Sequence, residues 1–310
     1  MKNLGLQSPQ SANAHPMLPL LKAMRPHQWV KNGLVLAPLL FAHKLDASES
    51  VLAATVALAV FCALSSSVYL LNDILDRDAD RKHPTKCKRP IAAGDLGLTA
   101  AIWAGIALLM LATAGTVHLS ALHPNPSQGP QFWVWPTLYL GMNVAYSLGL
   151  KRRVIIDCLC IALGFQFRVQ AGSAAIDVDS SKWILLCTFF FALFLAFCKR
   201  REELARCGDS SGRATMRAYT LPFLDQLIAP LAALSILTYA LYTMDTETSA
   251  RHDTQNMMFT VPFVVFGVFR YLFLIHVRGG GEDPARLLFR DRQLVLSGVL
   301  WMIAVLLILS

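Results

Sequence analysis

Four aspartates stand close together at residues 72–94, NDILDRDADRKHPTKCKRPIAAG, between two long apolar stretches. If the preceding helix continues through this segment, residues three and four apart share one face. Asp73, Asp76 and Asp80 then form an acidic stripe, whereas Asp78 points elsewhere, toward water. Neighbouring carboxylates repel one another unless a cation neutralises them, and Mg²⁺ prefers oxygen ligands of this kind. We therefore predict that the stripe holds Mg²⁺ and takes part in catalysis.

Bases follow the acidic stripe directly and fit the anion that such a metal would carry. Lys86, Lys88 and Arg89 are expected to hold the oxygens of a diphosphate bridged by Mg²⁺. Asn72 adds an amide oxygen as a further metal ligand. The alternative is a helix end whose acids only pair with neighbouring bases. These bases are Arg77, Arg81 and Lys82.

Two ionisable side chains, Asp157 and Arg168, lie inside a segment that is otherwise apolar. An ionisable residue within a membrane span is costly and indicates either a functional site or a buried pair. Eleven residues make about three helical turns, so the two side chains share a face but stand ~16 Å apart along the axis. We do not expect them to pair directly, and we expect each to face a polar cavity.

Two further charged segments have ordinary explanations as well as functional ones. The run FCKRREELARCG, around Lys199, is on charge alone best interpreted as a solvated helix end. In MRPHQWVKNG, Arg25 and Lys31 could anchor the chain at the membrane interface. Gln28 and Asn32 are polar neighbours four residues apart, and they indicate the wall of a polar cavity.

The composition indicates a membrane protein that could hold these residues at helix ends. Of its 310 residues 55% are hydrophobic and only 15% are charged, whereas a soluble chain carries about 25% charged residues. We predict an all-α polytopic membrane protein, with a flexible tail over 1–23 and one transmembrane domain over 24–310. Nine spans are expected, at 30–43, 51–72, 98–120, 132–149, 154–175, 183–199, 221–243, 257–276 and 293–309.

Lysine and arginine alternate strongly between the loops that join these spans. Of the 28 Lys and Arg, 23 lie in the N-terminal segment or in the loops after every second span. Such an asymmetry marks the cytoplasmic side of a membrane protein. It predicts a cytoplasmic N-terminus and an external C-terminus. The net charge of +8 therefore indicates orientation and gives no reason to expect a nucleic-acid partner.

The segment NDILDRDAD fits the pattern N-D-x-x-D-x-x-x-D, and KRPIAAG follows it. With nine expected spans, the chain resembles the UbiA-type superfamily of intramembrane transferases from about Met24 to its last span. The resemblance implies a nine-helix bundle with a polar cavity that opens to the cytoplasm, in the inner membrane of a bacterium. It also implies a homo-oligomer, as a trimer.

Within that superfamily the sequence departs from the aromatic prenyltransferases. The loop after the sixth span reads KRREEL where those enzymes carry a second aspartate-rich motif, and His83-Pro84 stands where they show Arg-Thr. RPHQWVKN, HPTKCKRPIA, YSLGLKRRVIID and CKRREEL instead resemble the decaprenyl-phosphate phosphoribosyltransferases. That branch transfers 5-phosphoribose from phosphoribosyl diphosphate to a polyprenyl phosphate, and its product feeds arabinofuranose donors for cell-envelope glycans.

This resemblance implies roles for the remaining polar residues. Asp157 would stabilise the oxocarbenium character of the anomeric carbon, and the lipid phosphate, already an anion, would attack without a general base. Three anionic groups in one cavity call for many bases. The substrate-binding residues expected are Arg25, Lys31, Asn72, Arg81, Lys86, Lys88, Arg89, Tyr146, Lys151, Arg168 and Lys199.

Two other functions remain open on the sequence. The first, within the same fold, is transfer of a prenyl group from a prenyl diphosphate to an aromatic acceptor. The second is a transporter or a lipid-binding scaffold. The charges gather at one membrane face, whereas transporter sites lie near the midplane, and this favours the transferase.

Overall fold

The computed structural model describes residues 17–83, 85–124, 126–127, 129–207, 214–245, 254, 256–277, 287 and 290–309. These described residues form helices joined by turns, with no strand among them. The chain divides into two compact units, of which unit 1 takes 1–30 and 62–111 and unit 2 takes 31–61 and 112–310. Helices α3 (Ser48–Leu75) and α6 (Leu98–Leu122) run through the boundaries. The single domain over 24–310 stays a prediction.

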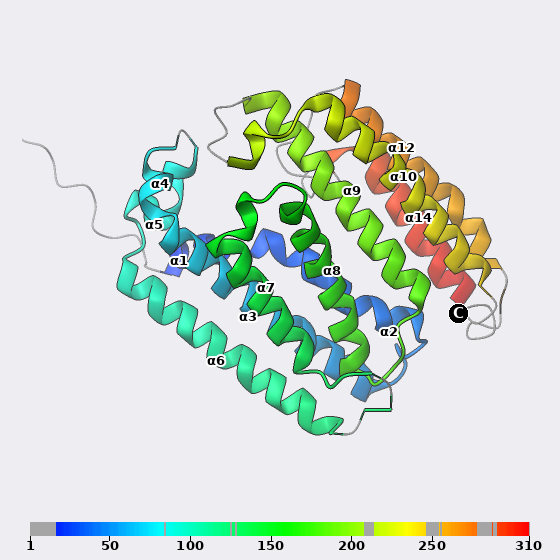
Figure 1. Ribbon diagram of the computed structural model, residues 1–310. Coiled ribbons are helices and arrows are strands. Elements are labelled where there is room, and N and C mark those ends of the chain that lie inside the picture. Colours follow the sequence, from blue (N-terminus) through cyan, green and yellow to red (C-terminus); the bar gives the residue numbers. More distant parts are fainter. Residues whose placement is uncertain are drawn as a thin grey trace, which may run out of the picture. The chain divides into compact units, whose positions relative to one another are not determined.

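Unit 1 gathers short helices around the end of α3. They are α1 (Met17–Met24), α4 (Arg77–Arg81), η2 (Lys86–Lys88) and α5 (Pro90–Ala93). Figure 1 shows α1, α4 and α5 close together, and a small apolar core that includes Ala23, Leu70 and Ile91 joins them. The flexible tail expected over 1–23 is therefore helical from Met17 onward, because Ala23 is buried in this core. Residues 1–16 lie outside the described residues.

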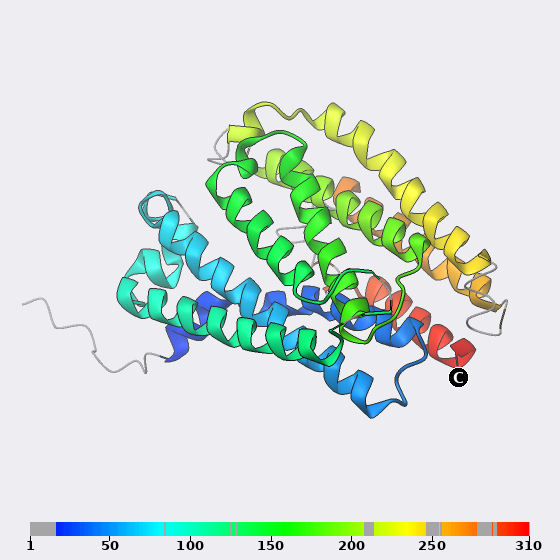
Figure 2. The ribbon, with the colours of Figure 1, turned by 60° about the horizontal axis from the view of Figure 1, so that its bottom comes forward.

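Unit 2 holds the remaining helices. Its short elements are α2 (Ala37–Phe41), η3 (Leu150–Arg152), η5 (Ala214–Arg217) and η6 (Asn256–Thr260). Its long helices are α7 (Val134–Leu148), α8 (Ile156–Ala175), α9 (Lys182–Cys207), α10 (Leu221–Met244), α12 (Val261–Val277) and α14 (Arg292–Leu309). Helices α9, α10, α12 and α14 run alongside one another (Figures 1 and 2), and α8 packs between α7 and α9.

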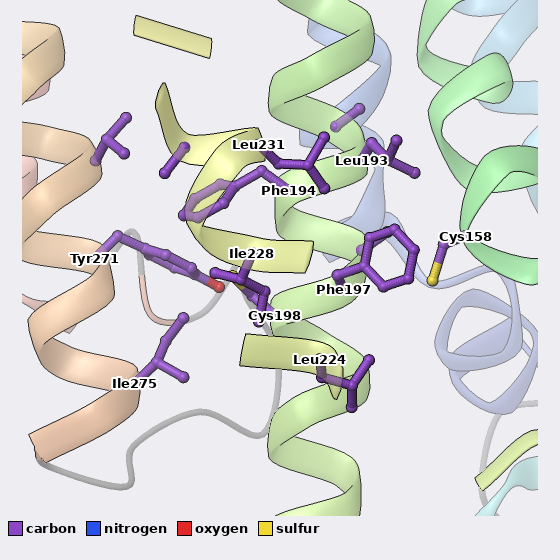
Figure 3. Close-up of a cluster of buried hydrophobic side chains, with 14 of the residues drawn as sticks. Cys158, Leu193, Phe194, Phe197, Cys198, Leu224, Ile228, Leu231, Tyr271 and Ile275 are labelled. Carbon is purple, nitrogen blue, oxygen red and sulfur yellow. The ribbon is translucent and has the colours of Figure 1, made fainter. Parts of the chain in front are cut away.

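The main core of unit 2 lies between α8, α9, α10 and α12. Figure 3 shows Phe194 of α9 and Ile228 of α10 close to Tyr271 of α12. On the other side of α9, the ring of Phe197 points toward Cys158 of α8. Each of these side chains is at least 97% buried. Because Cys158 directly follows Asp157, this apolar core borders Asp157, one of the two ionisable residues expected inside the spans.

Arg270, another charged residue inside a predicted span, has a structural explanation. Its Nη2 lies 2.8 Å from Oδ2 of Asp291, and its Nε donates to Oδ1 at 3.2 Å. Oδ1 of Asp291 also accepts the backbone N–H of Leu294 at 3.0 Å, which caps the first turn of α14. The pair therefore ties α12 to the start of α14.

Helices cover all nine predicted spans, but they differ in length and in apolarity. Among the described residues, five helical segments are long and apolar enough to cross a membrane: Ser48–Leu75, Leu98–Leu122, Lys182–Arg206, Leu221–Met244 and Asn256–Val277. The chain is thus an integral membrane protein. The first predicted span is a 3₁₀ helix, η1 (Pro26–Leu36), followed by the short α2, with Pro38 in its first turn. Nine membrane-crossing helices and the polar cavity stay predictions.

The 3₁₀ helix η1 reaches α8 at a point of very close backbone approach. A Cβ atom built on Gly172 of α8 would lie 2.0 Å from the carbonyl oxygen of Val35 and 3.1 Å from Pro38. Only glycine leaves room for this contact, because backbone cannot move aside as a flexible side-chain end can. Gly172 therefore fixes how the chain around Val35, in the part of η1 that belongs to unit 2, lies against α8, and with it the position of Asn32.

We predict that Gly172→Ala destabilises the protein by about 1–3 kcal/mol, the usual range for forcing an extra methyl group into a packed site. Gly267→Ala is the matched control, because a Cβ at Gly267 in α12 meets nothing within 4 Å. The measurement is the thermal unfolding midpoint of both variants in the same detergent. Equal midpoints for Gly172→Ala and wild type would contradict the close approach.

Candidate functional site

The acidic stripe lies in unit 1, where α3 ends and α4 begins. Asp73 is in the last turn of α3 and Asp80 is in α4, and both are buried, whereas Asp76 between the helices is half-buried. The side chain of Asp78 is 90% exposed and its nearest base is Arg81, at 3.9 Å. Asp78 is therefore exposed, as the phasing predicted, although the helix does not continue unbroken through the stripe: α3 ends at Leu75 and α4 begins at Arg77.

Two arginines contact the buried acids of this stripe, and one of them bridges both. Arg89 Nη1 donates to Asp73 Oδ1 at 3.1 Å and to Asp80 Oδ2 at 2.7 Å. Arg25 Nη2 donates to Asp73 Oδ1 at 2.6 Å, and its guanidinium lies over the ring of Tyr69. We name Asp73, Asp76, Asp80, Arg25 and Arg89 the acidic site. Its arginines, which we expected to bind phosphates, contact carboxylates here.

The local sequence explains why Arg89 reaches both acids. Pro90 suits the first turn of α5, where a missing backbone N–H costs nothing. Gly94, with φ of 90°, ends this helix in the left-handed conformation that favours glycine. Arg81 Nε donates to the carbonyl oxygen of Ala92 at 3.2 Å and holds α5 against α4. Arg81, expected to bind substrate, thus contacts the protein backbone.

The acidic site offers one free carboxylate oxygen to a metal. Asp73 Oδ2 is buried and has no hydrogen-bond partner among the described residues. Half-buried Asn72 and Asp76 flank it in sequence and carry oxygen atoms, the ligands that Mg²⁺ prefers. Within the part of the chain that the structure describes, no three acids, histidines or cysteines already form a ligand cluster. The residues present therefore fit a cation held chiefly through Asp73.

Lys86 and Lys88 lie in η2, between α4 and α5. Lys86 is half-buried and Lys88 is exposed. The ring Nδ1 of His83 accepts the backbone N–H of Thr85 at 3.3 Å and that of Lys86 at 3.4 Å. His83 thereby orders the turn that carries both lysines.

A second polar cluster lies in unit 2, around Asp157. This carboxylate is fully buried, and its Oδ2 lies 3.1 Å from Nε of Arg200, which is 1% exposed. Arg200 Nη1 donates to Glu203 Oε2 at 2.5 Å. Tyr219 donates its hydroxyl hydrogen to Asp157 Oδ1 at 2.9 Å. We name Asp157, Arg200, Glu203 and Tyr219 the Asp157 network.

The Asp157 network contains residues that the sequence did not single out. Burial raises the pKa of Tyr219 well above its ordinary value, so the phenol stays protonated and can donate. Arg200 belongs to the KRREEL run, which charge alone assigns to a solvated helix end. Asp157 Oδ1 accepts from Tyr219, whereas Oδ2 faces Arg200 as an ion pair and has no hydrogen-bond partner among the described residues. The role predicted for it at the anomeric carbon stays a prediction.

Arg168 is buried in unit 2 among neutral partners. Its Nε donates to Asn32 Oδ1 at 2.7 Å, Nη1 to the Gly164 carbonyl at 2.6 Å and Nη2 to the Tyr139 hydroxyl at 3.0 Å. Its guanidinium also lies over the rings of Tyr139 and Phe165. No carboxylate among the described residues pairs with it. Arg168 and Asp157 do not pair, as we predicted, and the contacts that hold Arg168 are all with neutral groups.

The remaining predicted site residues also belong to unit 2. Tyr146, in the last turn of α7, is an electrostatic neighbour of Arg200. Lys151 is in η3, Lys199 precedes Arg200 in α9 and Lys31 is in η1, and all three are half-buried.

Comparison with known proteins identifies relatives along nearly the whole chain. The model of the UbiA prenyltransferase family matches residues 33–291. A protein of Mycobacterium tuberculosis named decaprenyl-phosphate phosphoribosyltransferase is 32% identical over 92% of this chain and 92% of its own length. One of Corynebacterium glutamicum with the same name is 32% identical over 92% of this chain and 85% of its own length.

Solved structures share the fold. A UbiA homolog from Archaeoglobus fulgidus, bound to GPP and Mg²⁺, superposes with a TM-score of 0.69. The comparison covers 94% of this chain and 99% of that chain, at 19% sequence identity. At this identity the likeness establishes the fold alone.

We predict that Arg200→Met costs about 3–5 kcal/mol of stability, because it leaves the buried Asp157 charge without its cation. Adding Asp157→Asn to Arg200→Met should recover part of this loss, since the charge is then gone. Arg206→Met, at an exposed position of the same helix, should stay within about 0.5 kcal/mol of wild type. Thermal unfolding in detergent measures all four proteins. A double variant no more stable than Arg200→Met would contradict the pairing.

Proposed function

Because the chain belongs to the UbiA prenyltransferase family, we propose that it transfers a 5-phosphoribosyl group from phosphoribosyl diphosphate to a polyprenyl phosphate. The observation that carries this proposal is the near full-length match to relatives named decaprenyl-phosphate phosphoribosyltransferase. In the reaction, the bond from the anomeric carbon to the diphosphate oxygen breaks, and a bond to the lipid phosphate oxygen forms. The leaving diphosphate keeps the electron pair, so no oxidant or reductant is needed.

The acidic site would receive the diphosphate end of the donor. Mg²⁺ bound at Asp73, with Asp76 and Asn72, would neutralise the charge that builds up on the leaving diphosphate. Lys86 and Lys88 lie on the neighbouring η2 and would bind its remaining oxygens. Arg25 and Arg89 already offset the charges of Asp73 and Asp80. These carboxylates can therefore stay close together before any metal arrives.

Residues of unit 2 would bind the other phosphates. Tyr146, Lys151 and Arg168 are candidates for the ribose 5-phosphate or the lipid phosphate, with Lys31 and Lys199 adding charge. Arg168 is the best supported of these, because its contacts orient the guanidinium without neutralising it. A phosphate near a buried, uncompensated cation gains more than one near a solvated lysine, since water does not screen the attraction.

A second candidate, prenyl transfer to an aromatic acceptor, takes its support from the solved structure that holds GPP and Mg²⁺. Against it, the end of α9 carries KRREEL. Here Arg200 binds Glu203 and Asp157, so these acids are engaged with a base and are not open as a second metal-binding pair. The phosphoribosyl donor, which has more phosphate groups, also agrees better with the surplus of bases.

We predict that purified protein in detergent, given Mg²⁺, phosphoribosyl diphosphate and a polyprenyl phosphate, forms an organic-soluble ribose phosphate. Chelation of divalent metal should abolish the product. The measurement counts radiolabelled ribose phosphate extracted into organic solvent. A parallel arm offers a prenyl diphosphate and a phenol. Prenyl transfer there, with no lipid-linked ribose in the first arm, would overturn the proposal.

We predict that Asp73→Asn lowers this activity by about 100-fold or more, the usual scale for losing one electrostatic contact to a transition state. Asp78→Asn is the matched control, because Asp78 is exposed and lies off the stripe. It should stay within about twofold of wild type. Each variant is assayed across Mg²⁺ concentrations after its folding is checked by gel filtration. Full activity of Asp73→Asn would remove the metal assignment.

We propose that the protein lies in the bacterial inner membrane with its N-terminus in the cytoplasm and its C-terminus outside. The Lys and Arg distribution supports this orientation. Alkaline phosphatase fused after residue 310 should be active, since this enzyme matures only outside the cytoplasm, and a fusion after residue 150 should be inactive. The reverse pattern would contradict the proposed topology.

A further inference from the structure

The turn before α8 holds a strained residue. Ile155 has φ of 69° and ψ of −46°, close to the rare and strained γ-turn, and the Ile156 N–H donates to the Val154 carbonyl oxygen at 2.8 Å across it. Such a conformation costs on the order of 1–3 kcal/mol and persists only where surrounding contacts enforce it. Ile155 directly follows the basic run Lys151-Arg152-Arg153, of which Lys151 and Arg152 lie in η3. The strained turn therefore sets the direction of the backbone next to this basic run.

The hydroxyl of one residue, Tyr219, contacts both sides of the strained position. It accepts the backbone N–H of Ile155 at 2.7 Å and donates to Asp157 Oδ1 at 2.9 Å. A phenol can do both at once, because it carries one donor hydrogen and free lone pairs. Tyr219 is 3% exposed, and its ring stacks on that of Phe223. We name the two hydrogen bonds of the Tyr219 hydroxyl, to Ile155 and to Asp157, the clasp. Together with the buried ring, they leave the hydroxyl little freedom to move.

Two other elements hold the residues of the clasp in place. Thr215 and Met216 of η5, just before Tyr219, are each at most 1% exposed. The segment that leads to Tyr219 is therefore packed into unit 2. On the other side, Arg200 of α9 holds Asp157 at 3.1 Å. The turn before α8 is thus fixed by η5 and by α9, neither of which is adjacent to it in sequence.

We propose that Tyr219 is a positioning residue, which holds the strained turn at Ile155 so that the basic run 151–153 presents its charges to a phosphate monoester. This rests on the proposed function, in which Lys151 binds either the ribose 5-phosphate or the lipid phosphate. Arg152 and Arg153 are exposed, so their backbone position, and not packing of their side chains, decides where their charge lies. Tyr219 itself does not have to touch substrate for this effect.

Tyr219→Phe tests the proposal, because it removes the hydroxyl and keeps the ring. Without the hydroxyl, the buried Asp157 Oδ1 loses its donor and the Ile155 N–H loses its acceptor, so the turn should relax. Trypsin cleaves after Lys and Arg, and its rate of cutting at 151–153 in the folded protein should rise about tenfold, as expected for loss of a hydrogen bond to a charged group. This readout needs no substrate and stands even if the proposed reaction is wrong.

Kinetics provide the second readout. For Tyr219→Phe, KM should rise about tenfold for the substrate whose phosphate the turn binds, with kcat within about twofold of wild type at saturation. Phosphoribosyl diphosphate and polyprenyl phosphate are titrated separately, and the one whose KM rises identifies the bound phosphate. Unchanged KM for both, in an active enzyme, overturns the proposal.

Tyr239→Phe is the matched control. Its hydroxyl is also buried, and it bonds to Thr260 Oγ1 at 2.6 Å and accepts from Trp301 Nε1 at 2.7 Å. Losing it should lower stability without changing the tryptic rate at 151–153 or either KM. If Tyr239→Phe raises the tryptic rate as much as Tyr219→Phe, the effect is general loosening and the proposal fails.

Ile155→Gly supplies the rescue. Glycine adopts φ of 69° without strain, so the turn should keep its conformation with less help from Tyr219. The double variant Ile155→Gly/Tyr219→Phe should then be cut more slowly than Tyr219→Phe alone, and no rescue would contradict the role of strain. If Tyr219→Phe does not fold, hydrogen exchange of wild type decides: the Ile155 amide must be protected, and exchange at the free-peptide rate overturns the clasp.

Discussion

The burial of Asp157 is the constraint that determines how α8, α9 and the segment after η5 meet in unit 2. A carboxylate with no access to water must find a cation and hydrogen-bond donors, or give up its charge. Arg200 supplies the cation from α9 and Tyr219 supplies the donor from the return after η5. Three segments far apart in sequence are therefore held at one point. The apolar core in Figure 3 begins one residue further along α8, at Cys158, and keeps water away from the pair.

The acidic site solves a similar problem in a different way. Asp73 and Asp80 would repel each other, and Arg89 bridges both while Arg25 neutralises Asp73 from α1's end. Arginine suits this task because its guanidinium stays charged and its donors form a fixed fork. One oxygen of Asp73 is left over. The protein's own arginines thus hold these acids together, and the metal proposed above would not have to gather them against their repulsion.

The sequence predicted local features well and long-range partners poorly. Helical phasing placed Asp78 apart from the stripe, and hydropathy located helical segments at all nine predicted spans. Both depend only on residues a few positions away. Arg200 was missed because KRREEL looks like a solvated helix end unless one knows that α8 brings Asp157 beside it. The clasp of Tyr219 was equally hidden, since 64 residues separate it from Ile155. Nor did the pattern show that Pro26–Leu36 winds as a 3₁₀ helix, which Gly172 accommodates through its missing Cβ.

The length of α9 can be compared with the thickness of a bilayer. Helices rise 1.5 Å per residue, so Arg200 lies ~27 Å along the axis from Lys182, and the hydrocarbon core of a bilayer is ~30 Å thick. By the same measure Asp73 lies ~37 Å from Ser48, at the start of α3. Each charge is thus separated from the start of its own helix by about the thickness of a bilayer core. For the proposed reaction, a helix of this length lets its charged end reach the phosphate of a lipid whose tail stays in the bilayer.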